Sequence, residues 1–255
     1  MANPALTKQF GGSGSAATLD AAATTVPVGF GEPGSDRMTI GGTARATGIL
    51  LAILLITAAW GWSISSPTGA LPGWALFALL GAFVLAIVTI FKPEIAVVTG
   101  PIYTAAQGVF IGAMSKAYEA AWGGIVVTAV LATAAVFIVM LVLFVTRTIK
   151  VTDRLRSVIV GATLGIALFY MVSLVLMLFG VQIPYVWEGG IGGILFSVLI
   201  VGIAAFNLLL DFDLIERGIA MGAPKRMDWF AAFSLMITII WLYIEILRLL
   251  GKARS

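Results

Sequence analysis

Two aspartates close a long apolar run in this chain. Asp211 and Asp213 end the stretch AFNLLLDFD, which begins at Ala205. An ionised side chain inside a membrane costs about 2.5–3.5 kcal/mol on insertion scales, so such groups are where function is best sought. A buried carboxyl group can attract a cation or exchange a proton. The same acids are equally compatible with a plain helix end, where both carboxylates meet water.

Two features weigh against the plain helix end. Acids at a helix C-terminus oppose the helix macrodipole. The helical pattern also continues through Phe212, Leu214 and Ile215, which gives the acids apolar neighbours. Asp213 is only two residues from Asp211, so it points to another face of the helix and is not an obvious partner for it.

A second group of polar residues lies within the last apolar run. Its members recur at helical spacing and share one helix face: Ser234, Thr238, Trp241, Glu245 and Arg248. One interpretation is hydrogen bonding between helices by the hydroxyl groups, with a local pair between Glu245 and Arg248. The other interpretation is a water-accessible pathway that this face lines.

The composition excludes several kinds of site. The chain has no cysteine and no histidine. Thiolate nucleophiles, disulfides and thiolate metal sites are therefore impossible, and so are the commonest general base and histidine-based metal sites. We find no zinc-protease motif, no glycine-rich phosphate loop and no nucleophile–base pair, and so expect neither an enzyme nor a bound cofactor. Whether a metal site exists is left open.

The composition also defines the class of protein. Hydrophobic residues make up 60% of the 255 residues and charged residues only 11%, whereas soluble domains carry roughly 25% charged residues. We therefore predict an all-α membrane protein with seven transmembrane helices. The predicted spans are 44–62, 72–91, 96–117, 124–146, 157–180, 191–215 and 229–250.

The segment before the first span has a different composition. Residues 11–36 read GGSGSAATLDAAATTVPVGFGEPGSD, with small and polar residues and no apolar period. We predict that residues 1–42 form a flexible N-terminal tail and that residues 43–255 form the seven-helix transmembrane domain.

The distribution of basic residues predicts the orientation. Eleven of the fifteen Lys and Arg residues lie before or at the N-terminal end of the first span or fall in the second–third, fourth–fifth and sixth–seventh connections. The positive-inside rule then places the N-terminus in the cytoplasm. The sixth span descends toward that side and the seventh rises from it. Asp211 should therefore lie level with Ser234 and Thr238, and well below Glu245.

Several segments, taken in order, resemble one known family. The strongest are FNLLLDFDLIERG and APKRMDWFAAFSLMITIIWLYIEILRLLG, and MTIGGTARATGILL, VFIGAMSKAYEA and RTIKVTDRLR support them. From about residue 38 to the end, the chain resembles the Bax inhibitor-1/YccA-like family of transmembrane proteins, and within it a bacterial branch.

The resemblance implies a fold and an activity. It implies six helices around a central seventh, closed near the cytoplasmic side, and a pH-sensitive calcium leak gated by two aspartates that share a proton. Asp211 matches the aspartate of the sixth helix. The matching position in the seventh helix is Thr238, so the chain departs from the paired-acid pattern.

We therefore hold two functional hypotheses. The first is a pH-sensitive calcium or cation leak in the bacterial inner or plasma membrane. Its gating and pathway residues would be Asp211, Asp213, Ser234, Thr238, Glu245 and Arg248. The second is a non-transporting regulator of a membrane protease or stress response that acts through protein contacts. The partners expected are the lipid bilayer, calcium or protons, and a membrane protein, but no nucleic acid.

Overall fold

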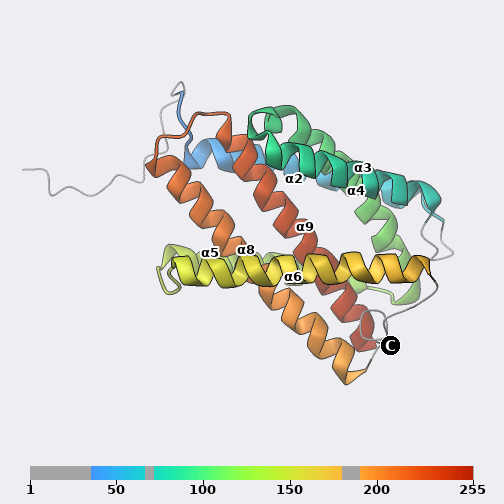
Figure 1. Cartoon of the computed structure of the whole chain (residues 1–255). Coiled ribbons are helices and arrows are strands. Elements are labelled where there is room, and N and C mark those ends of the chain that lie inside the picture. Colours follow the sequence, from blue (N-terminus) through green and yellow to red (C-terminus); the bar gives the residue numbers. More distant parts are fainter. Residues whose placement is uncertain (1–35, 67–71, 180–189, 255) are drawn as a thin grey trace, which may run out of the picture.

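The computed structural model describes residues 36–66, 72–179 and 190–254. In this part of the chain the regular elements are helices, which confirms the predicted all-α class (Figure 1). Seven of them are long and apolar enough to cross a membrane. They are α2 (Ile40–Ile64), α3 (Gly73–Phe91), α4 (Ala96–Ala121), α5 (Ile125–Val145), α6 (Asp153–Leu178), α8 (Ile191–Ala220) and α9 (Met227–Arg254), with a 3₁₀ turn η1 (Pro93–Ile95) before α4.

The helices are longer than predicted at several ends. α2 begins at Ile40 because Thr39 caps it: the Gly42 amide donates to the Thr39 hydroxyl at 2.9 Å. The first span thus starts inside the predicted tail 1–42, of which residues 1–35 lie outside the described residues. α8 continues to Ala220, well past the predicted end at 215. This extension places Asp211 inside the helix rather than at its end.

The outer surface of the bundle is apolar. Large side chains such as Phe77, Phe91 and Leu131 are 77%, 81% and 65% exposed. In water such a surface would be unfavourable, whereas lipid tails cover it without cost. The bundle is therefore suited to contact with a lipid bilayer, as the composition predicts.

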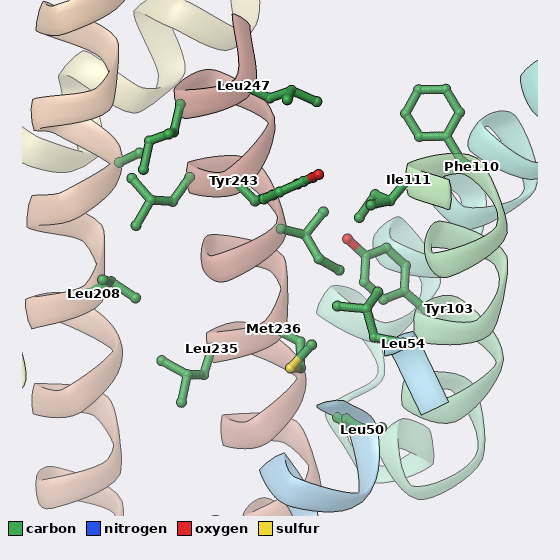
Figure 2. Close-up of a cluster of buried hydrophobic side chains, with 14 of the residues drawn as sticks. Leu50, Leu54, Tyr103, Phe110, Ile111, Leu208, Leu235, Met236, Tyr243 and Leu247 are labelled. Carbon is green, nitrogen blue, oxygen red and sulfur yellow. The ribbon is translucent and has the colours of Figure 1, made fainter. Parts of the chain in front are cut away.

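α9 is the most buried of the described spans. In its most apolar membrane-length stretch 67% of the residues are buried, against 6% for α6. α9 packs against α2, α4, α5 and α8. Figure 2 shows α9 between α8, which carries Leu208, and α4, which carries Tyr103 and Ile111. The arrangement of six helices around this one stays a prediction.

α2 and α4 pack closely because glycines face the partner backbone. A Cβ atom on Gly112 would lie 2.0 Å from the carbonyl oxygen of Ala58, and one on Gly108 would lie 1.9 Å from the hydroxyl of Thr57. Small residues of this kind let membrane helices approach until their backbones touch. The close fit of their backbones therefore holds α2 and α4 together.

The segment before α2 is bound to the turn between α8 and α9. The Met38 amide donates to the carbonyl of Ala223 at 2.7 Å, and the Thr39 amide donates to Asp228 Oδ1 at 3.0 Å. The hydroxyl of Thr43 donates to the same carboxylate oxygen at 3.0 Å. Asp228 is only 3% exposed, so this contact is buried. The start of the first helix and the start of the last helix are thus joined directly.

Contacts between loops and helix ends show which elements lie at each end of the bundle. Arg226, in the α8–α9 turn, pairs with Glu94 before α4 at 3.1 Å. At the opposite end, Arg254 donates to the carbonyl of Gly123 at 3.1 Å. α9 therefore runs from one end of the bundle to the other.

Candidate functional site

A short turn brings Asp211 and Ser234 to the same level. α8 ends at Ala220 and α9 begins at Met227, so the two helices form an antiparallel hairpin. Asp211 lies nine residues before the end of α8, and Ser234 lies seven residues after the start of α9. With a rise of about 1.5 Å per residue, both positions lie roughly 10–14 Å from the turn. Asp211 and Ser234 therefore lie at similar distances from the turn, as predicted from the sequence.

Asp211 is buried with one strong partner. The Ser234 hydroxyl donates to Asp211 Oδ1 at 2.6 Å. The other carboxylate oxygen, Oδ2, is buried and has no hydrogen-bond partner. Thr238 lies beside the same carboxyl group, but its hydroxyl donates weakly to the carbonyl of Ser234 at 3.4 Å. With Asp211 only 7% exposed, the interpretation as a solvated helix-end acid is wrong.

Asp213 has different surroundings. It is 8% exposed, and its oxygens are taken up by two arginines. Arg217 Nε lies 2.9 Å from Asp213 Oδ2 one turn along α8, and Arg156 of α6 forms a short ion pair with the same oxygen. The side chain thus ties α6 to α8 and does not join the contacts of Asp211.

Glu245, the acid of the predicted polar face, is buried and has several hydrogen-bond partners. It is 1% exposed. Arg248 Nη1 lies 3.2 Å from both carboxylate oxygens, so the local pair expected from the sequence is present. Trp241 Nε1 donates to Glu245 Oε1 at 3.3 Å, and the hydroxyl of Tyr170 on α6 donates to it at 3.0 Å. Arg248 also donates to the Tyr170 hydroxyl at 2.6 Å.

The polar face of α9 therefore holds two clusters at different depths. We call Asp211, Ser234 and Thr238 the lower cluster, and Tyr170, Trp241, Glu245 and Arg248 the upper cluster. Ser234 and Glu245 are eleven residues apart on one helix, which is about 16 Å. The lower cluster faces α8 and the upper cluster faces α6, so all six predicted site residues lie along α8 and α9 but are not brought into one site.

Three polar contacts at or near these clusters were not predicted. They are the contact of Tyr170 with the upper cluster, the hydrogen bond of 2.8 Å that Asn207 Nδ2 donates to the hydroxyl of Thr163, and the hydrogen bonds that Asp228 accepts from Thr39 and Thr43 at the start of α2. A signal for the first two was present in the sequence. Arg156, Thr163 and Tyr170 recur every seven residues in a mostly apolar helix, which puts them on one face.

The carboxylates do not gather into a metal centre. Among residues 36–66, 72–179 and 190–254, no group of three or more Asp or Glu side chains could hold a metal ion. Calcium takes six to eight oxygen ligands in protein sites, usually with several carboxylates. The chemistry within reach of Asp211 is therefore that of a single carboxylate beside two hydroxyl groups, which can attract a cation in passage or exchange a proton.

Comparison with known sequences identifies the family. The model of the family described as Bax inhibitor 1 like matches residues 3–255, so the match begins well before Met38, where the sequence resemblance was first recognised. No curated protein and no solved structure matches the chain. The match to nearly the whole chain agrees with seven apolar helices in the described residues: this protein belongs to the Bax inhibitor 1 like family of membrane proteins.

Proposed function

We propose that this protein is a proton-sensitive cation leak whose pathway follows the polar face of α9. The observation that carries the proposal is Asp211, a buried carboxylate with one strong hydrogen bond and one oxygen without a partner. An unsatisfied polar group at membrane depth is destabilising, and ionisable groups in such places usually mark ion or proton pathways. A role of Asp211 in conducting ions or protons would explain why the chain keeps this acid despite its cost in stability.

The lower cluster would act as the gate. A deprotonated Asp211 attracts a cation, and the hydroxyl groups of Ser234 and Thr238 replace part of the ion's water. Protonation removes the negative charge, so we expect the leak to fall in acid. Calcium is the cation we would test first, because carboxylate and hydroxyl oxygens suit hard cations.

The pathway would continue toward the upper cluster. Glu245 is balanced by Arg248, which leaves Tyr170 and Trp241 as the polar groups that line this part of the route. Ten of the fourteen basic residues that the structure describes belong to the end of the bundle near Asp211. By the positive-inside rule this is the cytoplasmic side, with the protein in a bacterial inner or plasma membrane.

The test is a flux measurement in proteoliposomes. Calcium entry would be followed in mildly acidic and mildly alkaline buffer for the wild type and for Asp211→Asn. We expect flux above that of empty liposomes, higher in the alkaline buffer, and a variant whose flux no longer depends on pH. A matched control is Asp213→Asn, which removes a charge two residues away but not the carboxyl group of the lower cluster. If Asp211→Asn keeps the wild-type pH response, Asp211 is not the gate.

A second function has its own supporting observation. The apolar packing around α9 is extensive, with Leu235, Met236 and Leu247 each at most 5% exposed (Figure 2). A sealed α9 suits a non-transporting regulator that binds a membrane protease or a stress-response protein. Absence of flux from folded protein, together with specific co-purification of one membrane protein that Asp211→Asn does not abolish, would favour this regulator.

A further inference from the structure

α6 is held less firmly than any other described span. In its most apolar membrane-length stretch, which lies within Asp153–Ser173, only 6% of the residues are buried, against at least 17% in each of the other described spans. Its backbone packs against α8, and Figure 1 shows it crossing α8 and α9 at an angle. A helix with so little buried surface forgoes the close backbone packing that holds α2 to α4, where glycines fit against the neighbouring backbone.

Polar side chains attach α6 to its neighbours, beside an edge-on ring contact of 5.2 Å between Phe169 of α6 and Phe196 of α8. Arg156, Thr163 and Tyr170 are seven residues apart, so they lie along one face of the helix. We call these three residues the heptad seam. The seam runs most of the length of the helix, since its first and last members are about 21 Å apart.

Each seam residue contacts a polar partner at a different depth. The first forms an ion pair with Asp213 near the basic end of the bundle. The second accepts a hydrogen bond of 2.8 Å from Asn207. The third donates a hydrogen bond of 3.0 Å to Glu245 of the upper cluster. Two partners belong to α8 and one to α9, so the seam attaches α6 to both helices.

Contacts of this kind separate and re-form readily. Hydrogen bonds between membrane helices are individually weak, because the separated groups find other partners. The ion pair of Arg156 is partly exposed, with 38% of the arginine side chain accessible. Separation along the seam also leaves the apolar core between α9 and α4 intact.

We infer that α6 is the moving wall of the pathway: it separates from α8 and α9 along the heptad seam and so opens the upper cluster. The inference rests on the proposed function, because it names the helix whose movement admits the cation. In the closed state Tyr170 covers Glu245, which is 1% exposed. When α6 moves away, Glu245 keeps the hydrogen bonds from Trp241 and Arg248, so the opened cluster remains stable.

The test uses a cross-link across the seam. The chain has no cysteine, so introduced pairs react alone. Thr163→Cys combined with Asn207→Cys joins α6 to α8 through a short bifunctional thiol reagent whose linker a reductant cleaves. Thr89→Cys combined with Thr99→Cys is the matched control: these buried hydroxyls of α3 and α4 are 2.7 Å apart and lie outside the pathway.

We expect calcium flux through the seam pair to fall to the level of empty liposomes on cross-linking and to return after reduction. The control pair should conduct equally in both states. Flux that persists in seam-linked protein, with linkage verified by mass, would overturn the moving wall.

A distance measurement separates this inference from the proposed function. If the wild type carries no flux, the leak is wrong, but movement of α6 is still measurable. Spin labels at Leu168→Cys on α6 and Leu55→Cys on α2 report it, and labels at Leu131→Cys on α5 and Leu55→Cys serve as reference; all three side chains are exposed. Combining Tyr170→Phe with Thr163→Val should broaden the α6 distances only. An α6 distribution that stays narrow and unchanged would overturn the inference without reference to flux.

Discussion

The lower and upper clusters each hold one buried carboxylate, Asp211 of α8 and Glu245 of α9, and the two acids differ in how many hydrogen-bond partners they have. Glu245 receives hydrogen bonds from Tyr170 and Trp241 and pairs with Arg248. Asp211 receives one strong hydrogen bond, from Ser234, and keeps an oxygen without a partner. Both are less than a tenth exposed. The two acids are therefore both buried but differ in the number of hydrogen bonds that their carboxylate oxygens accept.

The difference separates an acid that holds the fold from one that is available for function. A buried charge with a counter-charge and enough donors is stable in place, and losing one partner is costly. A buried acid without enough donors costs stability, so its presence needs another explanation. We therefore assign a structural role to Glu245 and the functional role to Asp211.

The largest expected effect comes from breaking the upper cluster. Arg248→Met leaves the charge of Glu245 buried without its counter-charge, and we expect a loss of about 3–5 kcal/mol in the free energy of unfolding. Adding Glu245→Gln should restore most of the loss, because no buried charge remains. Reversible unfolding in mixed micelles measures both. If Arg248→Met alone is as stable as the wild type, Glu245 does not have the structural role that we assign to it.

An opposite sign is expected in the lower cluster. Asp211→Leu removes an acid with an unsatisfied oxygen, so we expect the protein to become more stable by about 1–3 kcal/mol. The same unfolding measurement applies, with Asp213→Leu as the control. That control should be destabilising, because it leaves Arg156 and Arg217 without their common partner. A destabilised Asp211→Leu would make Asp211 a structural residue like Glu245.

The smallest expected effects come from deleting one hydroxyl group at each acid. Tyr170→Phe leaves Glu245 with Trp241 and Arg248, so we expect the free energy of unfolding to fall by about 0.6 kcal/mol, the average for hydrogen bonds between membrane helices. Ser234→Ala removes the one strong donor to Asp211, so its effect should be nearer the observed maximum of ~1.7 kcal/mol. Equal losses would mean that the number of donors does not distinguish the clusters.

The fold could be predicted from the sequence to a large extent. Seven apolar runs separated by glycine, proline or charged residues predict seven helices, and each helix lies where its run lies. The ends were less predictable because they depend on contacts. α2 begins early because Thr39 caps it, and α8 continues past Asp211 because Asp213 is neutralised by Arg156 and Arg217. The predicted tail falls almost wholly outside the described residues.

The site was predictable only where two helices are joined by a short turn. The hairpin of α8 and α9 fixes the relative height of its residues, so the approach of Ser234 to Asp211 follows from counting. The position of α6 depends on rotation and crossing angle, which periodicity does not give. For this reason the contact of Tyr170 with Glu245 could not be predicted. The ion pair of Asp213 with Arg156 of α6 could not be predicted either.

The join between Thr39 and Asp228 has a consequence for how the chain is made. The two residues are 189 positions apart, so at 5–20 residues per second roughly 10–40 s of synthesis separate them. The first helix therefore enters the membrane long before Asp228, the buried acceptor for Thr39 and Thr43, has been made. During that time the side of α2 that packs against α9 lacks this partner, whereas α4, which packs against the small residues of α2, is made soon after it. A ribosome stalled before the last hairpin would hold a first helix that α4 already packs against but whose contact with Asp228 has not yet formed.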